Sequence, residues 1–367
     1  MSEEHRGDPA TLSNPNELPL LRLFRDRLYR NIKKRFLLRG FRPYRAVNGG
    51  YDRAAIDAVC AQVSESLSGL GLNNPFSLYQ QVVDFFAHRN RYIVRPLRDL
   101  KEPLPPHYAS VCFRHDLDGD IVTGIRAACY LARQGVPGSF YVLHTSGYYG
   151  YLDNGTFVRN VAMESYIADL VATGCEIGLH TDPLYLFCKH DINGCSAVKE
   201  EIAWLRSLDA NVCGSVAHNS AHLFGAENFE IFRGRSWGGR HGFECDGKRV
   251  PLQIIDEKSL GLRYEGNYPI QSDDFDTEVA AEFLSFLPDD GIRSPAWQKN
   301  YFMENPMFRR GYDMDIWLLG TDAWMVADYR TGKMMWPVTT ETMLGYLDEE
   351  EPGYRAVISI HPEYVSK

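Results

Sequence analysis

Histidine and aspartate side chains recur at the ends of the strands that we predict for this 367-residue chain. In a parallel α/β protein, functional side chains collect at the carboxyl ends of the strands, where loops hold them above a packed core. The four strand ends read Arg114-His115-Asp116-Leu117-Asp118, His180-Thr181-Asp182, His218-Asn219-Ser220 and His361-Pro362. Because the same residue types return at all four, they indicate a shared functional site.

These residue types suit a hydrolytic metal site. Such a site needs about three protein ligands and an open position for water, and the ion lowers the pKa of that water and polarises a carbonyl. A further carboxylate can accept a proton, and a further histidine can protonate the leaving group. Asp116 and Asp118 are two residues apart and can take neighbouring roles where their strand ends. The alternative for Asp118 is that it caps a helix starting near Gly119.

The elements that must position these residues are short strands alternating with helices. Strands are predicted from β-branched and aromatic runs at 110–116, 139–145, 175–182 and 213–219. Helical patterns lie between them at 120–135, 157–174 and 196–208. This alternation predicts βαβ units and a parallel sheet with right-handed crossovers. A barrel-like α/β fold is favoured, and a doubly wound open sheet is the alternative. Less regular strands are predicted at 250–256, 314–320, 323–328 and 355–364.

Residues 1–105 do not show this alternation of strands and helices. We predict that they form a helical, basic N-terminal extension, joined to a catalytic part at 106–367. In the first predicted helix, apolar residues recur at helical spacing: Leu21, Phe24, Leu28, Ile32 and Phe36. Two more helices are predicted at 51–71 and 74–94, followed by a proline-rich linker at 100–108.

The charge balance narrows the possible partners. The chain carries 39 basic and 48 acidic side chains, a net charge of −9, which argues against a nucleic-acid binder. The stretch 22–45 is nevertheless strongly basic, with Asp26 as its single acid. An amphipathic basic helix at 20–45 fits peripheral contact with an anionic membrane surface, and packing on the barrel or on another subunit of an oligomer is the alternative.

The ends and the cysteines favour a cytoplasmic protein. No secretory pattern begins the chain, and no apolar stretch is long enough to span a membrane. The eight cysteines are scattered without framework spacing, so we expect reduced thiols. The possible ligands of a structural zinc are Cys188, His190, Cys195, His241 and Cys245. We disfavour such a site because these residues include no CxxC pair.

Five segments, in this order, resemble the polysaccharide deacetylase superfamily, carbohydrate esterase family 4. They are FRHDLDGD, GCEIGLHTD, GIRSPAW, TDAW and ISIHPEY. The likeness is to the branch with an Asp-x-Asp first motif, and it covers roughly residues 108–365. It implies a distorted (β/α)7-type barrel and a metal-dependent carbohydrate N-deacetylase.

The resemblance implies roles for the first two motifs. Asp116 would be the general base and Asp118 a metal ligand, with His180 as the first metal histidine. The family usually has a second histidine four residues on, but position 184 is Leu. His218 is the favoured replacement, and His222 and Asp182 are alternatives. Zinc is the expected ion, given a site that contains histidine.

The later motifs complete the implied site. Arg293 would orient the catalytic aspartate, and backbone N–H groups after Pro295 would help to hold the oxyanion. Asp322 would tether Arg293. Trp297 and Trp324 would line the sugar pocket, with core packing as the alternative for both.

The implied reaction ends at His361, the expected general acid. An acetyl or formyl group would leave an amino sugar, and the expected substrate is an intracellular nucleotide-linked, lipid-linked or growing surface glycan such as O-antigen in lipopolysaccharide biosynthesis. The alternatives are a catalytically degenerate relative that binds glycans, and an amidohydrolase of the same fold acting on small cyclic amides.

Overall fold

The computed structural model describes residues 51–69, 71–218, 226–236, 240–266, 316–320, 324–328, 330–331 and 333–366. Several predictions concern residues outside these ranges. They are the basic segment 20–45 and the site residues His222, Arg293, Pro295, Trp297 and Asp322.

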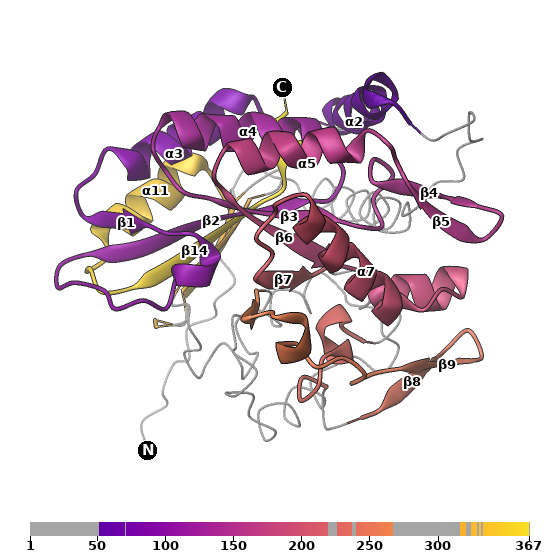
Figure 1. Ribbon diagram of the computed structural model, residues 1–367. Helices are drawn as coiled ribbons and strands as arrows, with labels where there is room; N and C mark the ends of the chain where they lie inside the picture. Colours follow the sequence, from indigo (N-terminus) through magenta and orange to yellow (C-terminus); the bar gives the residue numbers. More distant parts are fainter. Residues whose placement is uncertain are drawn as a thin grey trace, which may run out of the picture.

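A curled, largely parallel sheet forms the centre of the structure (Figure 1). Its strands run in the order β10 (Tyr264–Glu265), β7 (Gly214–Ala217), β6 (Glu176–Thr181), β3 (Ser139–Leu143), β2 (Ala109–Leu117), β14 (Arg355–Ile360), β11 (Ile316–Gly320), β12 (Trp324–Asp328) and β13 (Lys333–Val338). Neighbours from β10 to β11 are parallel, whereas β12 is antiparallel to both of its neighbours. The fold is therefore α/β, as predicted, and the curled sheet is consistent with a partial barrel.

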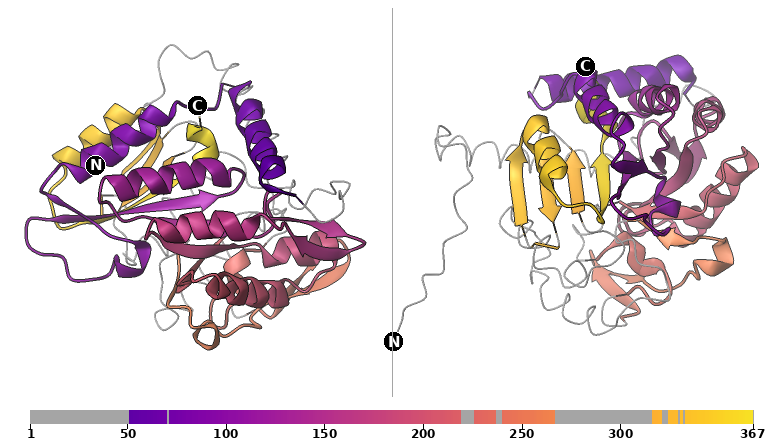
Figure 2. Two further views of the ribbon diagram at one scale, coloured as in Figure 1. Left: turned by 45° about the horizontal axis from the view of Figure 1, so that its top comes forward. Right: turned by 90° about the vertical axis from the view of Figure 1, so that its left-hand side faces the viewer.

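Helices cover one face of this sheet (Figures 1 and 2). The predicted helices at 120–135 and 196–208 are confirmed as α4 (Ile121–Arg133) and α7 (Gly194–Ser207). The helix predicted at 157–174 is present only in part, because α5 spans Met163–Ala172. Its predicted start is instead β5 (Thr156–Arg159), which pairs with β4 (Gly150–Asp153). The Phe157-Val158 pair suits a strand, and the prediction was wrong at that point.

Alternation along β2 separates the helix-covered core from the opposite face of the sheet. Phe113 packs against Phe86 of α3 (Phe76–Ala87), and Leu117 lies against Gly124 of α4. His115 stacks on Phe140 of β3 with ring centroids 4.1 Å apart. Because successive side chains of a strand point to opposite faces, Arg114 and Asp116 project away from these helices.

Two tyrosines fill the inner face of the sheet below the strand ends. Tyr141 and Tyr264 meet through their hydroxyl groups at 2.6 Å, and Tyr264 donates to Glu176 Oε1 at 2.8 Å. Both rings lie over glycines, since a Cβ at Gly178 would be 2.5 Å from Tyr141 and one at Gly214 would be 1.9 Å from Tyr264. The inner face is therefore packed below the level at which the strands end.

Residues 51–105 share the core of this sheet. The helices predicted at 51–71 and 74–94 are confirmed over α2 (Arg53–Ser68) and α3, and α3 contributes Tyr79, Val82, Val83 and Phe86 to the same hydrophobic cluster as β2. The end of the second predicted helix is instead β1 (Tyr92–Val94), which pairs in parallel with β2. The boundary at 105/106 stays a prediction.

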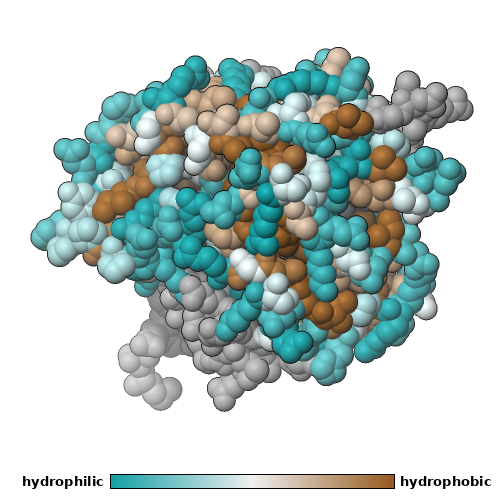
Figure 3. All heavy atoms as spheres, in the orientation of Figure 1, coloured by the Kyte–Doolittle hydropathy of each residue, from teal (hydrophilic) through white to brown (hydrophobic). Residues whose placement is uncertain are grey.

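The described surface is mixed in polarity. On the face in Figure 3, hydrophilic and hydrophobic residues are interspersed. The large apolar side chains that are exposed come from separate segments: Tyr108, Val122, Val161 and Ile254. No helix in the described part of the chain is long and apolar enough to cross a membrane.

Candidate metal centre

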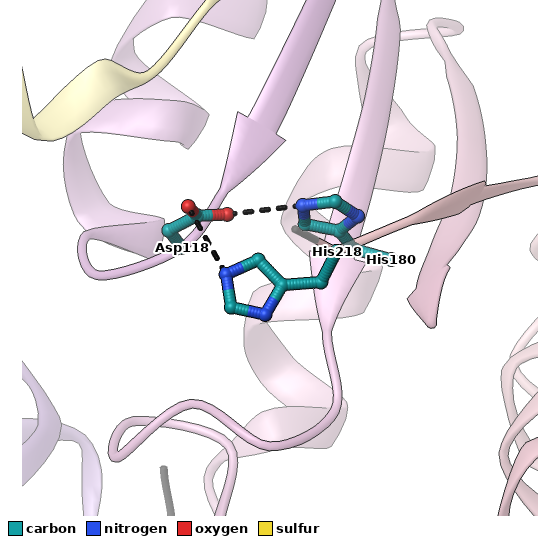
Figure 4. Close-up of side chains that lie close together, drawn as sticks. All are labelled: Asp118, His180 and His218. Atoms are coloured by element: carbon teal, nitrogen blue, oxygen red, sulfur yellow. Dashed lines mark ion pairs between the residues drawn. The ribbon is translucent and has the colours of Figure 1, made fainter. Parts of the chain in front are cut away.

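Three predicted site residues converge at the carboxyl ends of β2, β6 and β7 (Figure 4). Asp118 follows β2, His180 lies in the last part of β6, and His218 directly follows β7. Asp118 Oδ1 is 3.1 Å from His180 Nε2, and Asp118 Oδ2 is 3.5 Å from His218 Nε2. Neighbouring parallel strands end at the same edge of the sheet, and this brings together residues far apart in the sequence.

Asp118 is available for this site because another aspartate caps the following helix. Asp120 is the N-cap of α4, and its Oδ1 accepts from the backbone N–H of Thr123 at 2.9 Å. Asp120 Oδ2 also accepts from the Thr123 hydroxyl at 2.6 Å. The capping role considered for Asp118 therefore belongs to Asp120, two residues later.

Both histidines turn Nε2 toward Asp118 because Nδ1 has a partner elsewhere. His180 Nδ1 lies 2.8 Å from the carbonyl oxygen of Val216, which can only accept, so Nδ1 carries the hydrogen. His218 Nδ1 lies 3.2 Å from Asp182 Oδ2. In the neutral ring, each Nε2 then presents a lone pair to a carboxylate oxygen. A positive charge, a proton or a metal ion, is needed between them.

The donor set fits a small divalent ion. Ligand bonds of about 2.0–2.1 Å at tetrahedral angles place two donor atoms roughly 3.4 Å apart. Each histidine Nε2 lies at a similar distance, 3.1 or 3.5 Å, from the nearer oxygen of Asp118. Asp118 Oδ1 is buried without a hydrogen-bond partner. Within the described ranges, Asp118, His180 and His218 form the one group of three or more possible ligands, with their donor atoms within 4.8 Å of one another. In the disfavoured cysteine site, Cys188 and Cys245 contact each other, but no third possible ligand among the described residues joins them, and all eight cysteines are free.

The carboxylates and histidines of this cluster shift one another's pKa values strongly. Burial lowers the pKa of His218, but the carboxylates of Asp118 and Asp182 outweigh burial and raise its pKa to about 10. Burial alone would raise the pKa of Asp118, yet His218 and His180 hold it well below its usual range. Without an ion, a proton on His218 supplies the positive charge that the carboxylates require.

Asp116 lies beside this cluster and forms a bidentate ion pair with Arg114. Arg114 donates from Nε to Asp116 Oδ1 at 2.8 Å and from Nη2 to Oδ2 at 2.6 Å. Burial would raise the pKa of Asp116, but Arg114, with His180 and His361, outweighs burial and lowers that pKa. Asp116 Oδ2 is also 4.0 Å from His180 Nε2. We assigned no role to Arg114 from the sequence, although residues two apart on a strand share a face.

His361 approaches the cluster from β14, the neighbour of β2. Its Nε2 is 3.7 Å from Asp118 Oδ2, and its Nδ1 is buried without a hydrogen-bond partner. Burial lowers the pKa of His361. Two residues later, the Glu363 carboxyl is buried, and burial raises its pKa well above the usual range, with Asp118 adding to the rise. Glu363 was not predicted, because its burial depends on packing between distant elements.

The other predicted positions have different surroundings. Leu184 stands where the resemblance leads one to expect histidine, and it is fully buried in the core. Trp324 is also buried in the core, and its Nε1 donates to Thr340 Oγ1 at 3.0 Å. A role for Trp324 in binding sugar stays a prediction. Asp182 lies behind His218 rather than in the ligand group.

Comparisons with known proteins do not assign this chain to a family. No family model matches the chain, and neither the curated proteins nor the solved structures contain a significant match.

Proposed function

We propose that the chain is a metal-dependent hydrolase that removes an N-acyl group, acetyl or formyl, from an amino sugar. The observation that carries this proposal is the convergence of Asp118, His180 and His218 beside a second carboxylate, Asp116, and a further histidine, His361. Hydrolysis needs ligands, a base and an acid within reach of one another. The motifs that resemble the polysaccharide deacetylase superfamily support the choice of an N-acyl sugar.

Asp118, His180 and His218 would hold the ion, most simply Zn²⁺, which when bound polarises a carbonyl and lowers the pKa of water. Asp116, kept ionised by Arg114, accepts the proton of the attacking water. The oxygen of that water forms a bond to the acyl carbon, and the amide C–N bond breaks. His361 gives a proton to the departing amine, so that a free carboxylic acid and an amino sugar remain.

The proposal extends to the setting of the enzyme. The curled sheet would be the core of a distorted (β/α)7-type barrel of the polysaccharide deacetylase superfamily. The protein would act in the cytoplasm on a glycan of surface-polysaccharide biosynthesis, such as a lipid-linked precursor. The basic segment 20–45 would contact the anionic membrane surface, where a lipid-linked glycan is presented.

Metal analysis and an activity panel test this function together. The purified full chain is expected to hold close to one equivalent of zinc, and Asp118→Ala is expected to lose it. Asp153→Asn, at an exposed carboxylate of β4, is the control that keeps the metal. Release of acetate or formate from N-acyl hexosamine oligosaccharides and their nucleotide-linked forms is then measured. A chain that binds no divalent ion would refute the proposal and favour a glycan-binding role.

A further inference from the structure

Asp182 is a buried carboxylate held behind one of the three candidate ligands. It is 1% exposed and follows β6, directly after Thr181. Its Oδ2 is 3.2 Å from Nδ1 of His218, on the opposite side of the imidazole from Asp118. His218 is therefore held between two carboxylates, one at each ring nitrogen.

The Asp182 carboxylate is itself fixed by residues from separate elements. Thr145, just after β3, donates its hydroxyl to Oδ2 at 2.7 Å. Asn228, at the start of the short 3-10 helix η4 (Asn228–Ile231), donates from Nδ2 to Oδ1 at 2.9 Å. The backbone N–H of Asp182 donates to His144 Nε2 at 2.7 Å. Both carboxylate oxygens and the main chain are thus held in place.

Asn228 ties the same carboxylate to the main chain of its histidine. The Nδ2 group that contacts Asp182 also donates to the carbonyl oxygen of His218 at 2.6 Å. Its Oδ1 accepts from the backbone N–H of Leu184 at 3.0 Å. Asn228 therefore cannot rotate its amide to suit a changed neighbour without giving up contacts on both sides.

We propose that Asp182 is a positioning residue of the metal centre, which fixes His218 with hydrogen on Nδ1 and the Nε2 lone pair directed at the ion. This inference rests on the proposed function. A histidine that ligates a metal commonly donates its other N–H to a carboxylate, which orients the ring and makes it a better donor. Leu184 supplies no ligand from this turn, so the site depends on His218, and His218 depends on Asp182.

Asp182→Asn tests this role with little change in shape. An asparagine has one acceptor oxygen, whereas Asp182 accepts at both oxygens, from Thr145 and His218 at Oδ2 and from Asn228 at Oδ1. Whichever way the amide is turned, its NH₂ group must face a donor. Thr145→Val removes one of these contacts while the carboxylate remains, so it is the milder second variant.

The measurement is the zinc dissociation constant of the full chain after chelator treatment, obtained by competition with a chromogenic chelator at neutral pH. We expect Asp182→Asn to weaken zinc binding by about 10- to 100-fold, Thr145→Val to weaken it less, and Asp153→Asn to leave it unchanged. Co²⁺ bound in place of zinc gives a second readout. Its visible absorption should change in Asp182→Asn, because the His218 donor has changed, and stay the same in Asp153→Asn.

The outcomes separate this inference from the proposed function. If the wild type binds zinc and Asp182→Asn binds it equally well with an unchanged Co²⁺ spectrum, Asp182 has no positioning role and the proposed function still stands. If the wild type binds no zinc, both fail. If Asp182→Asn does not fold, Thr145→Val decides, and wild-type affinity in that variant overturns the inference.

Discussion

Replacement of Arg114 by Met is expected to destabilise the protein strongly, because it leaves the Asp116 carboxylate buried without its partner. Arg114 meets both Asp116 oxygens, at 2.8 and 2.6 Å, and the two side chains are only 3% and 4% exposed. Met preserves much of the length and apolar volume of the Arg stem. The substitution therefore removes the guanidinium fork with limited change in packing.

The magnitude follows from the burial of this pair. Two opposite charges 4 Å apart interact by about 4 kcal/mol at an effective dielectric constant of 20. Removing one partner of a buried pair costs about 3–5 kcal/mol, because the remaining charge is uncompensated. Arg114 is the largest of the groups that lower the pKa of Asp116, ahead of His180 and His361, so this pKa should rise in the variant. The loss should therefore shrink as the pH falls and Asp116 becomes protonated.

Urea unfolding of the protein in the presence of a chelator measures this loss without a contribution from bound metal. Arg53→Met is the matched control, because Arg53 and Asp169 form an ion pair with side chains 50% and 43% exposed. An exposed pair contributes about 0.2–1 kcal/mol. The double variant Arg114→Met with Asp116→Leu should recover most of the stability, since neither charge of this pair remains.

Two results would refute this reasoning. If Arg114→Met loses no more free energy of unfolding than Arg53→Met does, the buried pair does not stabilise the strand end. If the double variant is as unstable as Arg114→Met, the loss does not come from an unpaired Asp116 carboxylate. It comes instead from repacking or from the lost hydrogen bond of Arg114 Nη1 to the Gly266 carbonyl oxygen, which is 2.9 Å long.

His115 and Gly214 test the packing on the two faces of the sheet. Burial lowers the pKa of His115 to about 4, so the unfolded chain takes up a proton first and stability should fall by up to about 3 kcal/mol from pH 6.5 to 4. Urea unfolding across this range should show a smaller fall in His115→Gln, and equal slopes would contradict the assignment. Gly214→Ala should cost about 1–3 kcal/mol through its clash with Tyr264. Gly345→Ala, with open space around its Cβ, should lose no stability, and urea unfolding of both glycine variants measures the difference. Equal stability of the two variants would contradict the clash at Gly214.

Much of the fold could be predicted because the strands of the parallel sheet are buried apolar runs that end in polar residues. The segment 110–116 shows both features, and β2 confirms it. Short strands next to helices were not predicted correctly. Tyr92-Ile93-Val94 continues an apolar helical pattern, and a run of three residues cannot be told from a helix end by periodicity. This segment is a strand because it pairs with β2.

The site was predictable where strand ends carried ligand types, and unpredictable where a role depends on a distant partner. Asp118 and His180 followed from their motifs, and His218 was favoured over His222 and Asp182. That Asp182 supports His218 instead of replacing it depends on the ring between Asp182 and Asp118. That Asp120 caps α4 depends on where the helix begins, and helix ends are the least certain part of a sequence-based assignment.

The strand order has a consequence for how the protein is made. β14 lies in the middle of the sheet, between β2 and β11, and pairs Arg355 with Ser110 far earlier in the chain. The ribosome therefore completes β2, β3, β6 and β7 long before β14 emerges and pairs with the free edge of β2. Until then an apolar strand has an open edge, which invites association with other nascent chains. Expression should thus depend on chaperones or slow growth, and shortening the chain before Arg355 would remove an interior strand rather than a dispensable tail.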